Sequence, residues 1–126
     1  MQYIVPFGAG GAAELASRVV TEGFTDVLGQ PFVVENRPGA NGIIGTVQGA
    51  KATPDGYTLL QANGATFSVN PLLYKAATYD PAKDFTPIGL VARQPYVIAV
   101  SAGLPVHTLD ELIALAKEKG GRLTYA

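Results

Sequence analysis

The chain of 126 residues contains no cysteine and no tryptophan, and its only histidine is His107. The lack of cysteine excludes disulfide bonds, cysteine-ligated zinc and thiol nucleophiles, and a single histidine argues against a histidine-rich metal site or a Ser-His-Asp triad. Charged residues make up only 15% of the chain, and the net charge is -1. Because phosphate binding needs a surplus of Lys and Arg on one face, this balance argues against a nucleic-acid-binding protein.

Long apolar runs are also missing, although 48% of the residues are hydrophobic. A membrane-spanning helix needs about 20 consecutive apolar residues, so we expect no such segment here. We also expect no signal peptide in this chain, because the strand-like residues Tyr3, Ile4 and Val5 follow Met1 almost at once. The apolar content is instead enough for the buried core of one domain.

Short apolar runs alternate with helical patterns along the chain. In residues 12–28, Leu15 and Val19 repeat at the helical i, i+4 spacing, while Glu14 and Arg18 are positioned to pair on the more hydrated side. A capping box at residues 108–111 begins another helix. The alternation predicts an α/β fold with a mostly parallel sheet. Strands are predicted at residues 2–7, 32–35, 57–61, 85–91, 96–100 and 123–125, and helices at residues 12–28, 43–51, 69–73 and 109–119.

Two loops at the predicted carboxyl ends of strands, residues 7–11 and 63–66, are rich in small residues. Open parallel sheets bind ligands beyond these strand ends. The first loop also precedes a helix, so its backbone N–H groups and the helix dipole favour an anion. A tight turn without a ligand, a phosphate site and a carboxylate site all remain compatible with this pattern. The turn-rich residues 36–42 are interpreted as a connection, and His107 as an exposed residue before a helix cap.

One alternative from the motif alone is a small NAD(P)-binding, Rossmann-like domain. Gly8, Gly10 and Ala13 satisfy the dinucleotide-binding spacing between a strand and a helix. Glu35 lies at the end of the next predicted strand, roughly where a ribose-binding acid is expected. Pro6 before the loop and the turn directly after Glu35 weaken this hypothesis.

A wider set of motifs resembles the Bug family of substrate-binding proteins, the solute receptors of tripartite tricarboxylate transporters. The matching segments occur in the same order over essentially the whole chain, which is more specific than one glycine-rich loop. They are IVPF at residues 4–7 with Gly10 and Gly11, LGQP at 28–31, VVENRPGA at 33–40, PDGYTLL at 54–60, NPLLY at 70–74, YDPAKDF at 79–85 and LDELIA at 109–114.

The resemblance implies a periplasmic-binding-protein-like (type II) fold, with two lobes that close around a carboxylated metabolite. Residues 1–97 would form the N-terminal part of the first lobe, and residues 98–126 the hinge and the beginning of the second lobe. It implies a periplasmic, non-enzymatic protein without a cofactor, a catalytic residue or a metal, and with membrane transporter subunits as partners. Ligand contacts carried over from the family fall on Phe7, Gly8, Gly10, Gly11, Ala12, Asn63, Gly64, Ala65 and Thr66.

Two features depart from the family pattern. Family members usually carry a Ser or Thr and an Asp where this chain has Ala12, Ala13 and Glu14. Backbone N–H groups and water must then satisfy the ligand. Family members also continue well past Ala126, so the chain resembles a truncated receptor. A second alternative is therefore a truncated lobe that binds no ligand and associates with itself through an exposed apolar edge.

Overall fold

The central sheet contains three short parallel strands, β1 (Gln2–Val5), β2 (Val33–Asn36) and β3 (Thr58–Leu60), in the order β2-β1-β3. In this computed structural model, which describes residues 1–124, Ile4 of β1 lies opposite Glu35 of β2 and Leu60 of β3. Ile4 and Val5 are fully buried, since β1 is the middle strand. The predicted α/β fold with a parallel sheet is confirmed.

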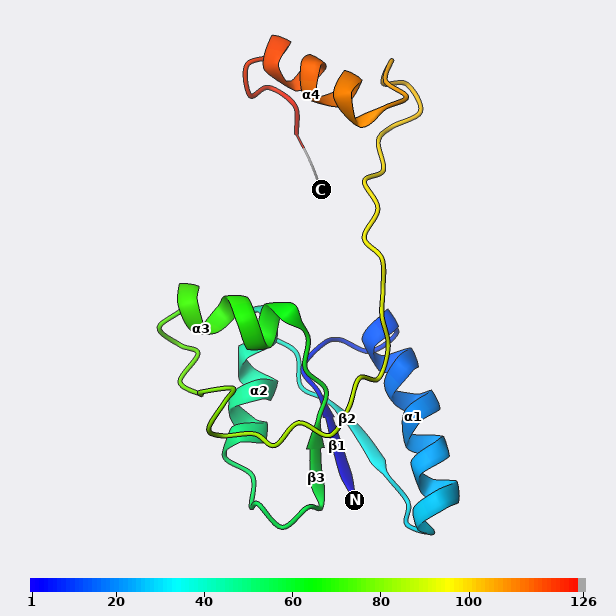
Figure 1. Ribbon diagram of the computed structural model, residues 1–126, viewed down its shortest axis with the longest axis vertical. Coiled ribbons are helices and arrows are strands. Elements are labelled where there is room, and N and C mark those ends of the chain that lie inside the picture. Colours follow the sequence, from blue (N-terminus) through cyan, green and yellow to red (C-terminus); the bar gives the residue numbers. More distant parts are fainter. Residues whose placement is uncertain (125–126) are drawn as a thin grey trace. The chain divides into compact units, whose positions relative to one another are not determined.

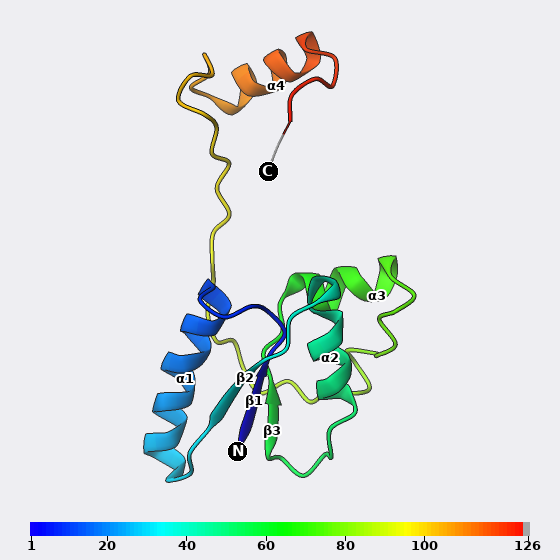
Figure 2. The ribbon, with the colours of Figure 1, turned by 180° about the vertical axis from the view of Figure 1, so that it is seen from behind.

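Two helices connect the three strands. Helix α1 (Ala12–Leu28) follows β1 and contacts β1 and β2, whereas α2 (Ile43–Ala50) follows β2 and contacts β1 and β3. They lie on either side of the strands in both views (Figures 1 and 2). Helix α1 has the predicted bounds and ends at Gly29, whose φ of 65° is the left-handed conformation that glycine adopts most easily.

The buried face of α1 differs from the one that the apolar repeat predicts. Leu15 and Val19 are 61% and 71% exposed, whereas Glu14, Ser17 and Thr21 are buried. The polar face can pack because its side chains find partners: Ser17 Oγ, for example, hydrogen-bonds with the Ala13 carbonyl oxygen and the Gln61 side chain. The prediction that the Glu14 side of α1 is the hydrated side is therefore wrong.

The segment after β3 is helical before it becomes irregular. A π-helical turn, η2 (Ala65–Val69), runs into the short helix α3 (Asn70–Leu73). Tyr79 then returns to the core beside η2, where it is 5% exposed and its hydroxyl donates to the Thr66 carbonyl oxygen. These contacts hold η2 against the chain that follows it.

The strands predicted at residues 85–91 and 96–100 are not formed. Both segments are irregular and lack a ladder partner within residues 1–124. Their apolar side chains are largely exposed, with Ile88 at 76% and Tyr96 at 95%. The prediction is wrong because β-favouring side chains specify a strand only where a neighbouring strand takes up the backbone N–H and C=O groups. Of the strand predicted at 123–125, Leu123 and Thr124 are irregular and Tyr125 lies outside the described residues.

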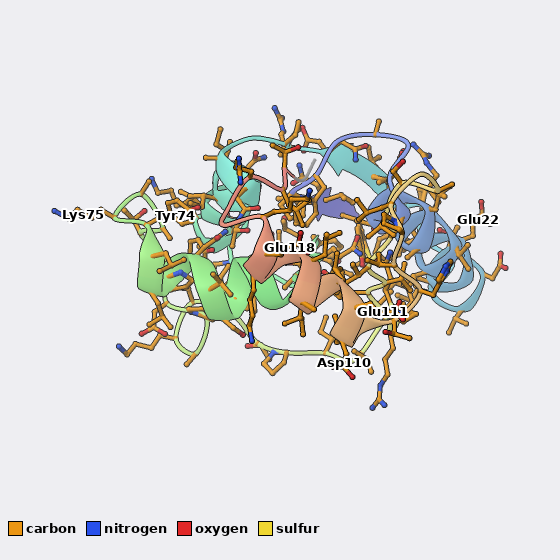
Figure 3. All side chains as sticks on the ribbon, turned by 90° about the horizontal axis from the view of Figure 1, so that it is seen from above. Glu22, Tyr74, Lys75, Asp110, Glu111 and Glu118 are labelled. Atoms are coloured by element: carbon orange, nitrogen blue, oxygen red, sulfur yellow. The ribbon has the colours of Figure 1, made fainter. Side chains whose placement is uncertain are left out.

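The chain divides into two units, Met1–Arg93 and Gln94–Ala126. The boundary lies close to the predicted one after residue 97, and the assignment of the two parts to two lobes stays a prediction. In the second unit, α4 (Leu109–Glu118) has the predicted capping box: Thr108 Oγ1 accepts the Glu111 N–H at 3.2 Å, and Glu111 Oε2 accepts the Thr108 N–H at 3.2 Å. Figure 3 shows Glu111 near the start of α4 and Glu118 near its end.

None of the helices in the described part of the chain combines the length and the apolar character that crossing a membrane requires. His107 is exposed directly before the capping Thr108, as predicted, and its backbone N–H donates to Glu111 Oε2 at 2.6 Å.

Candidate functional site

The strand order creates a switch point at the carboxyl end of β1. The chain moves from β1 to β2 on one side and then crosses to β3 on the other side. The loops after β1 and β3 therefore leave two adjacent strands in different directions, which is the geometry that opens a ligand crevice in parallel sheets. The two loops predicted to bind ligand are these two loops. The structure brings them to the same edge of the sheet.

The first loop, residues 7–11, presents backbone groups and almost no side chains. Gly8, Gly10, Gly11 and Ala12 are exposed, and an added Cβ at Gly8 or Gly10 would have no heavy atom within 4 Å. Gly10 has a φ of 83°, a conformation that favours glycine. Gly11 caps α1 without a side-chain acceptor, so the first-turn N–H groups of this 17-residue helix face an open surface.

Phe7, at the start of the same loop, is partly buried and is fixed by β2. The Asn36 Nδ2 group donates to the Phe7 carbonyl oxygen at 3.0 Å. Because Asn36 is the last residue of β2, this bond ties the direction of the loop to the neighbouring strand.

Glu14, in the first turn of α1, contacts the first loop and is buried, although the sequence pattern predicted it to be on the hydrated side. Its side chain is 6% exposed, and its Oε2 accepts the Gly10 N–H at 2.5 Å. Its Oε1 accepts from Arg18 Nε at 2.8 Å, which confirms the predicted Glu14–Arg18 pair. The Gly10 N–H, followed by the Arg18 guanidinium, lowers the pKa of the Glu14 carboxyl below its ordinary value. The sequence could have indicated this contact, because an acidic residue in the first turn of a helix often accepts a backbone N–H near the helix start.

The second loop, residues 63–66, closes on itself through Asn63 and Thr66. Asn63 Oδ1 accepts the Thr66 N–H at 3.0 Å, and Thr66 Oγ1 accepts the Asn63 N–H at 3.0 Å. Thr66 is fully buried, whereas Asn63 and Gly64 are exposed and Ala65 is half-buried. Thr66 therefore shapes the loop, and Asn63 and Gly64 form its open surface. The ligand contacts proposed for both loops stay predictions.

A third segment, residues 37–42, packs against the chain at both loops. An added Cβ at Gly42, whose φ is 84°, would lie 2.8 Å from Thr66 Cγ2 and 3.3 Å from the Pro6 carbonyl oxygen. Gly42 thus fits between the first and second loops, where a larger residue would separate them. The sequence pattern predicted that this segment is a connection. The glycine at position 42 was the signal in the sequence that the two loops pack closely here.

The alternative chemistries find less support in the geometry. Within residues 1–124, no group of three or more His, Cys, Asp or Glu side chains could hold a metal ion. Glu35, the acid of the dinucleotide hypothesis, is engaged by Gln2 Nε2 and by the Arg37 guanidinium. Two surface hollows, one between α1 and β2 and one beside Gln2 and Lys51, contain no residue of either loop.

Sequence comparison identifies the family. Residues 16–126 match the family described as tripartite tricarboxylate transporter family receptor. The protein BugT of Bordetella pertussis is 39% identical over 127 residues, covering 100% of this chain and 39% of BugT. The chain belongs to this receptor family, and the predicted resemblance is confirmed. It spans about 40% of the length of the relatives that it matches.

Solved structures agree with this assignment. Rpa4515 of R. palustris, solved with adipate, superposes with a TM-score of 0.85 at 35% identity, over 94% of this chain and 40% of that one. The periplasmic binding protein BugD gives 0.74 at 37% identity, over 94% and 39%. MatC from Rhodopseudomonas palustris, with bound malate, gives 0.77 at 30% identity, over 94% and 40%. The fold is that of a periplasmic binding protein, as predicted.

Proposed function

We propose that the chain is the ligand-binding N-terminal part of a solute receptor and that it recognises a small carboxylate through the backbone amides of residues 7–12 and 63–66. The observation that carries this proposal is the position of two exposed, amide-presenting loops on adjacent strands at one sheet edge. Two structural neighbours of the same family hold the dicarboxylates adipate and malate. A carboxylate of this size is therefore the ligand class that we assign.

The chemistry of the loops suits a carboxylate better than it suits a neutral ligand. The uncapped N–H groups at the start of α1 and the positive end of the helix dipole both stabilise negative charge. A hydrogen bond to a charged group contributes about 1.5–3 kcal/mol, so two or three amides suffice for a specific anion contact. None of the nine predicted contact residues carries a cationic side chain, so recognition rests on amides and bridging water.

The wider role follows from the family. The second unit would begin the lobe that closes over the ligand, and the closed form would be what the transporter subunits in the membrane bind. This role implies a periplasmic location, and the similar structure of BugD, described as a periplasmic binding protein, supports it. The rival hypothesis, an NAD(P)-binding domain, is supported only by the spacing of Gly8, Gly10 and Ala13.

A thermal-shift screen of the chain tests the ligand class. The ligands are adipate, malate and citrate, with uncharged adipamide as the matched control and NAD as the rival. A ligand that binds only the folded state raises the stability by about 2.7 kcal/mol at a hundredfold excess over its Kd. We expect a carboxylate to raise the Tm and adipamide to leave it unchanged. A shift with NAD alone, or with none of these compounds, contradicts the proposal.

A further inference from the structure

The first loop already holds a carboxylate, and that carboxylate belongs to the protein. Glu14 Oε2 accepts the N–H of Gly10, one of the amides assigned to the ligand. Within residues 1–124, Glu14 is the only charged residue that is buried, at 6% exposure. The Glu14 side chain is thus already hydrogen-bonded to the Gly10 N–H, which an incoming carboxylate would also use.

Arg18 compensates this charge only in part. Its Nε and Nη2 groups donate to Glu14 Oε1 at 2.8 Å and 2.5 Å, and its own side chain is 57% exposed. The contact with Arg18 uses one carboxylate oxygen, and the contact with Gly10 uses the other. Solvent screens the exposed guanidinium more than it screens the buried carboxylate. A net negative charge therefore remains directly behind the loop.

We propose that Glu14 is a resident carboxylate that competes with the ligand for the Gly10 amide and so limits how much negative charge the site accepts. This inference rests on the proposed function of the two loops. A single N–H group binds one carboxylate well, and a second carboxylate beside Glu14 is repelled. The repulsion grows with the charge of the ligand, so Glu14 selects dicarboxylates with separated charges over compact tricarboxylates.

A loop-holding role for Glu14 makes the opposite prediction. If its bond to Gly10 only kept the glycine-rich loop in its binding shape, neutralising Glu14 would loosen the loop and weaken every ligand. If Glu14 competes, the same change replaces a charged acceptor of the Gly10 N–H by a weaker neutral one and removes the repulsion, which tightens binding. The sign of the change in affinity separates the two roles.

The test is isothermal titration calorimetry of the whole chain with adipate and citrate. Glu14→Gln keeps the shape of the side chain and removes its charge. Glu22→Gln, on the exposed side of the same helix (Figure 3), removes one negative charge without touching Gly10 and serves as the matched control. Arg18→Gln leaves Glu14 in place without its cation. Circular dichroism confirms that each variant folds.

We expect Glu14→Gln to lower the Kd for adipate by about threefold to tenfold, with a larger effect for citrate. Glu22→Gln should leave both Kd values unchanged, and Arg18→Gln should raise them. If Glu14→Gln does not fold, Arg18→Gln alone decides. A Kd of Arg18→Gln that equals or lies below the wild-type Kd overturns the inference.

The outcomes also separate this inference from the proposed function. If the wild-type chain binds adipate and Glu14→Gln binds it equally or more weakly, only the inference is wrong. If the wild-type chain binds neither ligand and Glu14→Gln gains binding, the inference holds, and the proposed function of the native chain is wrong. Binding by neither protein contradicts both.

Discussion

Asn41 and Asn70 form a two-way hydrogen-bonded pair although they are 29 residues apart. Asn41 Nδ2 donates to Asn70 Oδ1 at 2.9 Å, and Asn70 Nδ2 donates to the Asn41 carbonyl oxygen at 2.9 Å. Asn70 is fully buried, and Asn41 has a φ of 54°. The pair joins residues 37–42 to the first residue of α3, directly after η2. It therefore connects the segment after β2 with the segment that carries the second loop.

We predict that Asn70→Ala lowers the free energy of unfolding by about 1–3 kcal/mol, because it removes a fully buried side chain together with both of its hydrogen bonds to Asn41. Asn41→Gly removes only the side chain, since glycine tolerates the positive φ. Urea denaturation of both single variants and the double variant should give a coupling energy of about 0.5 kcal/mol or more. Strictly additive effects would show that the pair contributes nothing.

The close packing of Gly45 in α2 against Pro6 and Arg37 gives a second prediction about stability. An added Cβ there would lie 2.8 Å from both the Arg37 carbonyl oxygen and the Pro6 Cα atom. Neither backbone atom moves easily, so Gly45→Ala should destabilise the fold by about 1–3 kcal/mol. Gly23→Ala is the control: it lies in the exposed part of α1 with no heavy atom within 4 Å, and it should stabilise by about 0.4–1 kcal/mol. Similar melting temperatures for the two variants would contradict this account of α2 packing.

A carboxylate placed in the first loop should strongly weaken ligand binding. Gly11→Asp adds a negative charge and an acceptor beside the first-turn amides of α1, so adipate should lose at least about tenfold in affinity. Gly23→Asp adds the same side chain farther along the same helix and should leave the affinity unchanged. Calorimetry of both variants makes the comparison. Equal affinities would show that the first loop does not hold the carboxylate.

Glu14 should also make stability depend on pH. Its pKa is lowered in the folded chain, by the Gly10 N–H and then by Arg18, from the ordinary value of 4.5. A lowered folded-state pKa means that the stabilisation is complete above 4.5 and is lost as the pH falls through the folded-state value. The difference in unfolding free energy between wild type and Glu14→Gln should therefore be constant well above pH 4.5 and shrink as the pH falls below that value.

Asp80 requires a control in this experiment. The Lys83 ammonium and the Ala82 N–H lower its pKa as well, so Asp80 contributes a pH dependence of the same sign. In an Asp80→Asn background the Glu14 effect should persist. A pH profile that is identical for wild type and Glu14→Gln would contradict the assignment.

Local patterns predicted much of the fold because they depend on residues close in sequence. The bounds of α1, its end at Gly29 and the capping box of Thr108 and Glu111 all follow from short-range rules, and the structure confirms them. The positions of the two small-residue loops after β1 and β3 also followed from the alternation of strands and helices. The family assignment came from motifs spread over the chain and was confirmed by comparison.

The errors concern contacts that local patterns do not encode. The burial of Glu14 depends on Gly10 adopting a φ of 83° and turning its N–H toward α1. The Asn41–Asn70 pair joins segments that are distant in sequence, and no short-range periodicity predicts it. Residues 85–91 and 96–100 have strand-like composition, but a strand also requires a partner, which the described part of the chain does not supply.

The central claim is that the amides of the two loops bind a carboxylate, and a ¹⁵N–¹H NMR titration of the chain with adipate tests it most directly. We predict shifts of the backbone amides concentrated at Gly8, Gly10, Gly11 and Ala12 in the first loop and at Gly64 and Ala65 in the second. Adipamide at the same concentrations should leave these amides unchanged. Shifts confined to other residues, or no shift at saturating adipate, would contradict the claim.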